Sequence, residues 1–176
     1  DSYKTFSEAE IEKEELLQIV KGKKEGENNF SQIYYQFHFR AVFEKLMGFD
    51  GGSTPPYAKI ISNITKQFFD IDDSVELSAT TNITYYDKEC MLASHSDGTG
   101  TGRICAVLIY LNETYDYNDG GILVLGNEYK VLPVFGNVAI IDLQSFDILH
   151  EVTKVTGGLG RFALLSFVKR KEDEFK

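Results

Sequence analysis

The chain has 176 residues, of which 43% are hydrophobic and 13% aromatic; it can therefore form one folded domain with a proper core, and it is not a disordered chain. Its net charge of −9 argues against a nucleic-acid partner, because phosphate binding needs clustered lysine and arginine. No run reaches the roughly 18 apolar residues that a membrane span requires.

Cysteines and glycosylation sequons give little sign of a secreted protein. Cys90 and Cys105 are the only cysteines, which is too few for a disulfide framework, and they lack the spaced histidines of a zinc site. Four N-x-S/T sequons begin at Asn29, Asn63, Asn82 and Asn112. Two of these sequons lie in strand-like segments, so we interpret them as coincidence and expect a cytoplasmic protein.

The first part of the chain is predicted to be mainly helical. An S-x-x-E capping box followed by apolar residues at helical spacing predicts a helix over residues 8–21. Similar spacing of aromatic and aliphatic residues indicates a second helix within residues 31–47. Pro55 and Pro56 suit the first turn of a third helix, with Thr54 as its cap.

From about residue 74 the sequence changes to short runs rich in Val, Ile, Leu, Thr and Tyr, separated by Gly, Asn and Asp. The runs cover residues 75–86, 103–111, 120–125, 130–135, 137–142 and 161–168. Strands at this spacing predict an all-β barrel or jelly roll. Because no linker or repeat divides the chain, we expect one domain over residues 1–176, in which residues 1–73 give mainly helical support and residues 74–170 form the β core.

Two of the three histidines fall in the β half, close to an aspartate. His95 and Asp97 stand two positions apart, and in an extended segment such side chains point to the same side and can share one cation. His150 follows the apolar run at residues 137–143. Two imidazoles and one carboxylate form the facial set that holds non-haem Fe(II) and leaves coordination positions open. An H-x-D pair by itself arises often by chance.

Arg161 strengthens this interpretation. It begins the last apolar run, 11 residues after His150. An arginine buried there is costly unless it meets an anion, and its guanidinium is well shaped to bind a carboxylate through two hydrogen bonds. The alternative is an arginine at a strand end that extends into solvent.

Residues 76–169 resemble the 2-oxoglutarate and Fe(II)-dependent oxygenases and, more narrowly, their prolyl 4-hydroxylase-like branch. The shared features are the H-x-D, a Y-L-N after an apolar strand, a D-G-G turn, a P-x-x-G step, H-E-V and the distal arginine. The resemblance implies a mainly β fold with flanking helices: a double-stranded β-helix, which is a jelly-roll or cupin-like barrel with helices along one sheet.

The resemblance also implies the cofactors and the residues that hold them. His95, Asp97 and His150 would bind Fe(II), and Arg161 would bind the distal carboxylate of 2-oxoglutarate. O₂ is the other co-substrate, and ascorbate is a candidate reductant. Related halogenases carry a small residue in place of Asp97, so its presence favours hydroxylation.

Further pocket residues follow from the same resemblance. Tyr110 would give a second contact to the distal carboxylate, and Tyr85 would line the cosubstrate pocket, with Tyr86 facing the other way. Arg103 would lie near the substrate entrance. Tyr115, in an aromatic-rich loop, could offer a stacking face to the substrate. Each of the four also has an ordinary structural explanation, such as a cross-strand contact or a solvated loop.

The chain departs from the family pattern after the distal arginine. Several relatives carry a hydroxyl residue two or four places beyond it, where this chain has Ala163 and Leu165. Three glycines between His150 and Arg161 indicate a wider turn than in some relatives.

These observations predict a 2-oxoglutarate-dependent dioxygenase. It would hydroxylate an unactivated C–H of an amino acid, a small metabolite or a peptidyl residue such as proline, with release of succinate and CO₂. We expect a small-molecule or peptide substrate, and neither a nucleic-acid nor a membrane partner. The alternative is a cupin-like protein that binds metal or ligand without catalysis or without a cosubstrate.

Overall fold

The computed structural model describes residues 35–38, 56–98, 101–126 and 128–171, and the side chains of all these except residues 35–38. The helix expected over residues 8–21 lies outside these ranges, as does Thr54. The single domain expected over the whole chain therefore stays a prediction.

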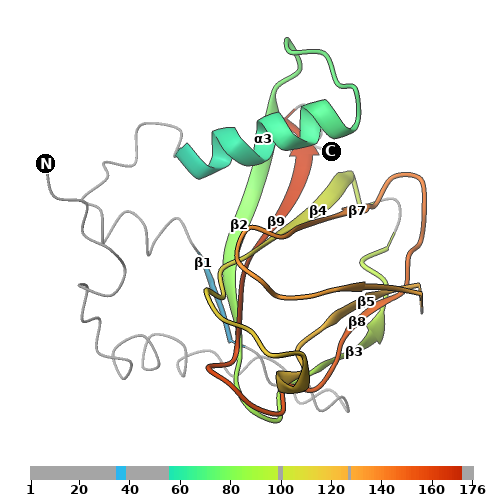
Figure 1. Ribbon diagram of the computed structural model, residues 1–176. Coiled ribbons are helices and arrows are strands. Elements are labelled where there is room, and N and C mark those ends of the chain that lie inside the picture. Colours follow the sequence, from blue (N-terminus) through green and yellow to red (C-terminus); the bar gives the residue numbers. More distant parts are fainter. Residues whose placement is uncertain (1–34, 39–55, 99–100, 127, 172–176) are drawn as a thin grey trace, which may run out of the picture. The chain divides into compact units, whose positions relative to one another are not determined.

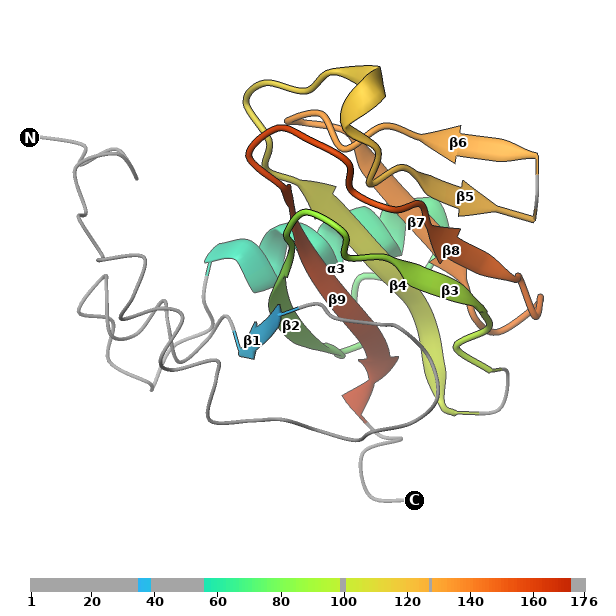
Figure 2. The same ribbon diagram turned by 90° about the horizontal axis from the view of Figure 1, so that it is seen from below.

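Within the described ranges, nine strands form two antiparallel sheets (Figures 1 and 2). The larger sheet has the order β1-β2-β9-β4-β7, with bounds Tyr35–His38, Leu77–Tyr86, Arg161–Arg170, Arg103–Tyr110 and Val138–Asp142. The smaller sheet has the order β3-β8-β5-β6, with bounds Leu92–His95, His150–Val152, Leu123–Leu125 and Tyr129–Val131. This is the jelly-roll arrangement of a double-stranded β-helix, as predicted.

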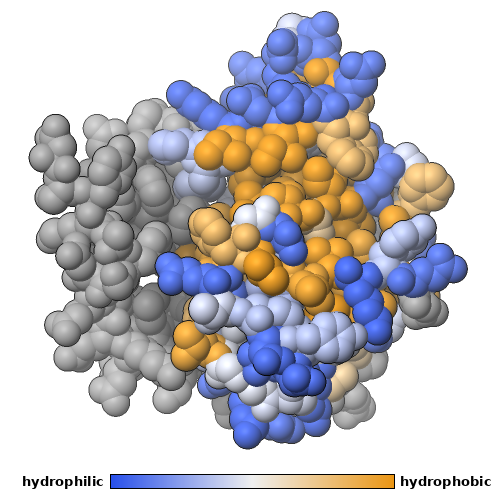
Figure 3. Space-filling view, viewed as in Figure 1, coloured by the Kyte–Doolittle hydropathy of each residue, from blue (hydrophilic) through white to orange (hydrophobic). Residues whose placement is uncertain are grey.

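The helix α3 (Pro56–Phe68) crosses the larger sheet. Its buried Ile61 joins an apolar cluster with Cys105, Val107 and Val168 on one face of that sheet. Figure 3 shows hydrophilic residues along the outer side of the helix and an apolar area below it, in the region of β4 and β7. The helix therefore covers the sheet with its apolar side, as its sequence pattern predicts.

The opposite face of the larger sheet points toward the smaller sheet and carries the interior of the barrel. Because side chains alternate along a strand, Arg161, Ala163 and Leu165 share one face of β9. On the neighbouring strands, Tyr86 pairs with Arg161 and Tyr110 pairs with Ala163. The register thus brings these residues to one end of the barrel interior.

One helix expected from the sequence is wrong in part. The described segment of residues 31–47 is the strand β1, whose four residues pair with β2 from Tyr85↔Tyr35 to Asn82↔His38. Pairing at the edge of β2 supplies backbone hydrogen bonds that override a local helical pattern. The third expected helix is confirmed, and the runs at residues 120–125 and 130–135 form only the three-residue strands β5 and β6.

Within the described residues, no helix is both long enough and apolar enough to span a membrane. The two cysteines, Cys90 and Cys105, are free and buried. Burial raises the pKa of the Cys105 thiol to about 11, so this thiol stays protonated and serves as a small apolar side chain.

Candidate active site

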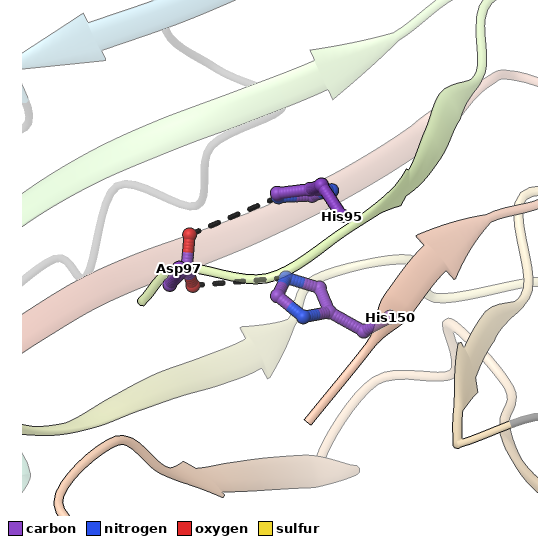
Figure 4. Close-up of side chains that lie close together, drawn as sticks. All are labelled: His95, Asp97 and His150. Carbon is purple, nitrogen blue, oxygen red and sulfur yellow. Dashed lines mark ion pairs between the residues drawn. The ribbon is translucent and has the colours of Figure 1, made fainter. Parts of the chain in front are cut away.

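Three side chains from the smaller sheet and its adjoining loop converge inside the barrel (Figure 4). His95 ends β3, His150 begins β8, and the two residues are directly paired with ring centroids 4.3 Å apart. Asp97 lies between them: its Oδ1 is 3.8 Å from Nε2 of His95, and its Oδ2 is 3.6 Å from Nε2 of His150. One ligand atom from each residue lies within 4.8 Å of the others, which fits a single bound ion.

Backbone carbonyls orient both imidazole rings. Nδ1 of His95 lies 2.9 Å from the carbonyl oxygen of Ala93, and Nδ1 of His150 lies 3.2 Å from that of Ile148. A carbonyl can only accept, so each Nδ1 carries the proton and each Nε2 keeps its lone pair. Such outer contacts fix the tautomer and the ring orientation of histidines that bind metals.

Burial lowers the pKa of His150, with His95 acting in the same direction, although the Ile148 carbonyl and the Asp97 carboxylate oppose the shift. The imidazole therefore stays neutral to a lower pH than a free histidine. A neutral imidazole is the form that binds a metal ion. The environment of His150 thus favours the ligand form at neutral pH.

Ser96, between the two ligands of the H-x-D, ties the two ligand-bearing segments together. Its hydroxyl donates to the carboxylate of Asp147 in the loop before His150, and it accepts a 2.9 Å hydrogen bond from the amide of Gly98. These contacts hold the turn that carries Asp97 close to the segment that leads into β8.

Arg161 lies inside the barrel at 2% exposure. Its guanidinium carbon is 4.9 Å from the ring centroid of Tyr86 and 5.0 Å from that of Tyr110, and Nη2 donates to the Tyr110 hydroxyl at 3.3 Å. Burial raises the pKa of Tyr110 although Arg161 opposes this shift, so its hydroxyl keeps its proton. Nε of Arg161 has no partner among the described residues, and it is a buried donor that an anion would satisfy.

One cavity of about 110 Å³ joins the arginine to the three convergent side chains. Arg161 and Tyr86 line one part of it, the triad lines another, and Phe167 also contributes to its wall. The guanidinium of Arg103 lies over the Phe167 ring, 3.9 Å from its centroid. The structure therefore places Arg103 next to a cavity-lining residue.

The expected role of Tyr85 is wrong by one position in register. Tyr86 lines the cavity, whereas Tyr85 stacks on Phe162 with ring centroids 4.4 Å apart. The cause is strand alternation: Tyr86 pairs with the inward-facing Arg161, so Tyr85 must face the other side of the sheet.

Tyr115 is not among the residues that line this cavity. Its hydroxyl donates to the carbonyl of Gly120 at 2.9 Å, and burial, aided by Asp119, raises its pKa to about 12. The loop around residues 112–119 thus uses the hydroxyl of this tyrosine as an internal support, and a contact between its ring and the substrate stays a prediction.

Thr84 is a cavity-lining residue that the sequence argument missed. It stands two positions before Tyr86 on β2, so it shares the inward face, and its hydroxyl donates to the Ala163 carbonyl at 3.2 Å. Strand alternation from Tyr86 would have found it, once the register was known. It places a hydroxyl on the strand beside Ala163 and Leu165, where this chain lacks the family's hydroxyl residue.

The donor set fits the cofactors of the resembling family. Two neutral imidazoles and a carboxylate suit Fe(II), and three ligands leave positions for other molecules. The unsatisfied Nε of a buried arginine suits a carboxylate in the same cavity. Both requirements are met by side chains that the folded chain holds in place.

Comparison with known proteins identifies the family of this chain. The model of the family described as "2OG-Fe(II) oxygenase superfamily" matches residues 81–169, just over half of the chain. The chain therefore belongs to this family, and it is a 2-oxoglutarate-dependent non-haem iron dioxygenase. No curated protein sequence matches it.

Several prolyl hydroxylases share the fold. For a Pseudomonas putida prolyl-4-hydroxylase the TM-score is 0.54 at 20% identity, over 70% of this chain and 69% of that one. For a viral collagen prolyl hydroxylase from Paramecium bursaria Chlorella virus-1, solved with 2-oxoglutarate, the TM-score is 0.53 at 14% identity, over 78% of this chain and 94% of that one. For a Trichoplax adhaerens prolyl hydroxylase, solved with a peptide fragment of hypoxia inducible factor, the TM-score is 0.52 at 21% identity, over 66% of this chain and 58% of that one. At these identities the likeness establishes the fold alone.

Proposed function

We propose that this protein hydroxylates an unactivated C–H bond of an amino acid, a small metabolite or a peptidyl residue such as proline, with conversion of 2-oxoglutarate to succinate and CO₂. His95, Asp97 and His150 hold Fe(II), while Arg161 holds the distal carboxylate of 2-oxoglutarate. The observation that carries the proposal is one cavity lined by both a metal-binding triad and a buried arginine whose Nε lacks a partner.

The bound iron and 2-oxoglutarate supply the oxidising chemistry, and the protein supplies orientation. His95, Asp97 and His150 would hold the ion with three ligand atoms and would leave its other positions to further ligands. Arg161, fixed between two tyrosine rings, admits the cosubstrate in one direction only, because one end must meet the guanidinium.

Tyr110 supports this orientation with its hydroxyl. It accepts a hydrogen bond from Arg161 and keeps its own proton, so it can donate to a carboxylate held by the same guanidinium. Tyr86 covers the face of the arginine and keeps water from its charge. The two rings thereby strengthen the attraction between Arg161 and an anion.

The substrate is proposed to approach from the part of the cavity marked by Phe167 and Arg103. Arg103 is only partly buried and stacks on a cavity-lining ring, so its remaining donors can meet a peptide carbonyl or a carboxylate. A peptide substrate agrees with the peptide bound by the Trichoplax relative.

The test begins with Fe(II) and 2-oxoglutarate in the absence of O₂. The wild-type protein should develop the weak visible charge-transfer band of the chelate and should release succinate when O₂ is added. A screen of free amino acids and proline-containing peptides should then find a substrate that gains the mass of one oxygen atom. Parallel reactions with and without ascorbate test its role as a reductant.

Arg161→Ala is the matched variant for this test. It should keep Fe(II) binding and lose most of the 2-oxoglutarate affinity, because the triad is intact and only the anion contact is removed. If the wild-type protein binds Fe(II) but shows no chelate band and no succinate, the proposal fails, and a metal-binding protein without cosubstrate takes its place.

A further inference from the structure

A single side chain, that of Asn112, ties down the backbone on both sides of Arg161. Its Nδ2 donates to the carbonyl of Gly160 at 2.7 Å, and its Oδ1 accepts from the amide of Phe162 at 2.8 Å. The arginine that projects into the cavity therefore stands between two backbone groups held by the same amide.

Asn112 is itself firmly placed. It is 7% exposed, and its backbone carbonyl oxygen accepts a 2.8 Å hydrogen bond from the backbone amide of Phe135. Both ends of its side-chain amide are satisfied, so turning or withdrawing it would leave buried polar groups unpaired. Attachment of a glycan at the N-x-T sequon of Asn112 would use this same side-chain amide and would break both of its hydrogen bonds.

The position of Asn112 follows from where the ladder between β4 and β9 ends. The last registered pair is Tyr110↔Ala163, and the amide of Leu111 then donates to the Phe162 carbonyl at 3.1 Å. At the next position the side chain of Asn112 takes over from the backbone. The ladder is thereby extended past Arg161 up to Gly160.

The same short segment also contacts the other end of the arginine. Tyr110, two residues before Asn112, accepts the hydrogen bond from Nη2 of Arg161. Gly121 leaves room for the stem of the side chain, because a Cβ there would lie 3.3 Å from Cβ and Cδ of Arg161. The guanidinium and the backbone of Arg161 are therefore located by residues 110 and 112 together.

We propose that Asn112 is a positioning residue for Arg161, and that it sets the selectivity of the site for 2-oxo acids that carry a second carboxylate. This inference rests on the proposed function, in which Arg161 binds the distal carboxylate. Without the clamp, the start of β9 keeps its pairing with β2 but loses the two hydrogen bonds that hold it on the side of β4, so the guanidinium can shift, and a misplacement of about 1 Å can cost an enzyme about 100-fold in rate. The metal triad comes from other strands and is not displaced.

The test compares two ligands that differ in the second carboxylate: 2-oxoglutarate and 2-oxobutanoate. Their affinities for the Mn(II)-loaded full chain are measured by calorimetry without turnover. Asn112→Ala should weaken 2-oxoglutarate binding by about 10- to 100-fold, which is what a hydrogen bond to a charged group contributes, and should change 2-oxobutanoate binding by less than about 2-fold. A merely structural role would weaken both ligands alike and leave their ratio unchanged.

Two further variants complete the design. Asn137→Ala removes an exposed amide that donates to the Leu132 carbonyl at 3.1 Å, and it should leave the ratio unchanged. Arg161→Ala should bind the two ligands with similar affinity. The double variant Arg161→Ala/Asn112→Ala should show the same ratio of affinities as Arg161→Ala alone, because Asn112 acts through Arg161. If Asn112→Ala does not fold, Asn112→Asp takes its place. It keeps the size and the acceptor but loses the donor to Gly160, so it should also lower the affinity for 2-oxoglutarate relative to that for 2-oxobutanoate.

The outcomes separate the two proposals. Normal 2-oxoglutarate binding by Arg161→Ala overturns the role of the arginine in the proposed function. The positioning role of Asn112 alone is overturned if Arg161→Ala loses the discrimination between the two ligands while the ratio of the two affinities is unchanged in Asn112→Ala or Asn112→Asp.

Discussion

The two ends of the cavity are built differently. The metal end stands on β3 and β8, strands of four and three residues. Two of its three side chains are partly open, His95 at 34% and Asp97 at 16% exposure, whereas His150 is buried at 7%. The arginine end stands on β2, β4 and β9, strands of ten, eight and ten residues, and Arg161 and Tyr110 are 2% and 0% exposed. One end is thus accessible and locally held, and the other is part of the core.

This difference follows from what each end must admit. Metal ion, O₂ and substrate reach the site from outside, so the triad lies where strands give way to loops. The distal carboxylate is a fixed anchor, so its arginine lies on long, paired strands. We expect ligand binding to order the metal end, and we expect the arginine end to be formed beforehand.

The largest effect should come from removing a ligand at the metal end. Wild-type protein at a Mn(II) concentration 100 times Kd should gain about 2.7 kcal/mol of unfolding free energy, whereas His150→Ala should gain almost none. Glu151→Ala changes the next residue of β8, on the other face of the strand, and should keep the gain. Urea unfolding with and without Mn(II) measures both, and an equal gain in His150→Ala would remove this residue from the metal site.

A smaller effect is expected where the two faces of β2 can be compared. Tyr86→Leu removes a ring from the buried guanidinium, a contact worth up to about 2 kcal/mol when desolvated, so 2-oxoglutarate affinity should fall by up to about 30-fold. Tyr85→Leu removes the stack on Phe162, which contributes about 0.5–1.5 kcal/mol beyond area burial, so it should lower stability and leave the affinity unchanged.

Calorimetry with 2-oxoglutarate and urea unfolding of both variants check this pair. The opposite result, with affinity lost in Tyr85→Leu alone, would restore the register expected from the sequence. It would also require Tyr85 to leave Phe162, against the alternation that pairs Tyr86 with Arg161.

The sequence reveals residues whose chemistry is unusual for their place. An aspartate two positions from a histidine and an arginine at the start of an apolar strand can be recognised without coordinates. The jelly-roll order could be predicted because the strands alternate with clear turn signals. The resemblance to the family assigned Tyr85 to the cavity, because the number of residues in the turn between β2 and His95 does not reveal the register. That turn includes Glu89 at φ 69°.

Asn112 was missed for a different reason. Its partners are backbone groups 48 and 50 residues away, and no local pattern indicates such contacts. Strand β1 likewise depends on an edge formed by residues 82–85, which come much later in the chain. The spacing of residues along the sequence predicts helices, strands and reactive side chains. It does not predict the long-range backbone contacts that hold these elements in place.

The smallest effect should come from the link between the two ligand-bearing segments. Ser96→Ala removes the hydrogen bond to Asp147, and a typical net value of about 0.5–1.5 kcal/mol predicts a loss of about 2- to 13-fold in Mn(II) affinity. Asp147→Ala should give the same loss, and Asp147→Asn, which keeps an acceptor oxygen, should lose less. Ser96→Ala and Asp147→Ala break the same contact. The double variant that combines them should therefore bind Mn(II) no more weakly than either single variant. Additive losses in calorimetric titration would mean that Ser96 and Asp147 act separately, and that the metal end is held by its imidazole contacts alone.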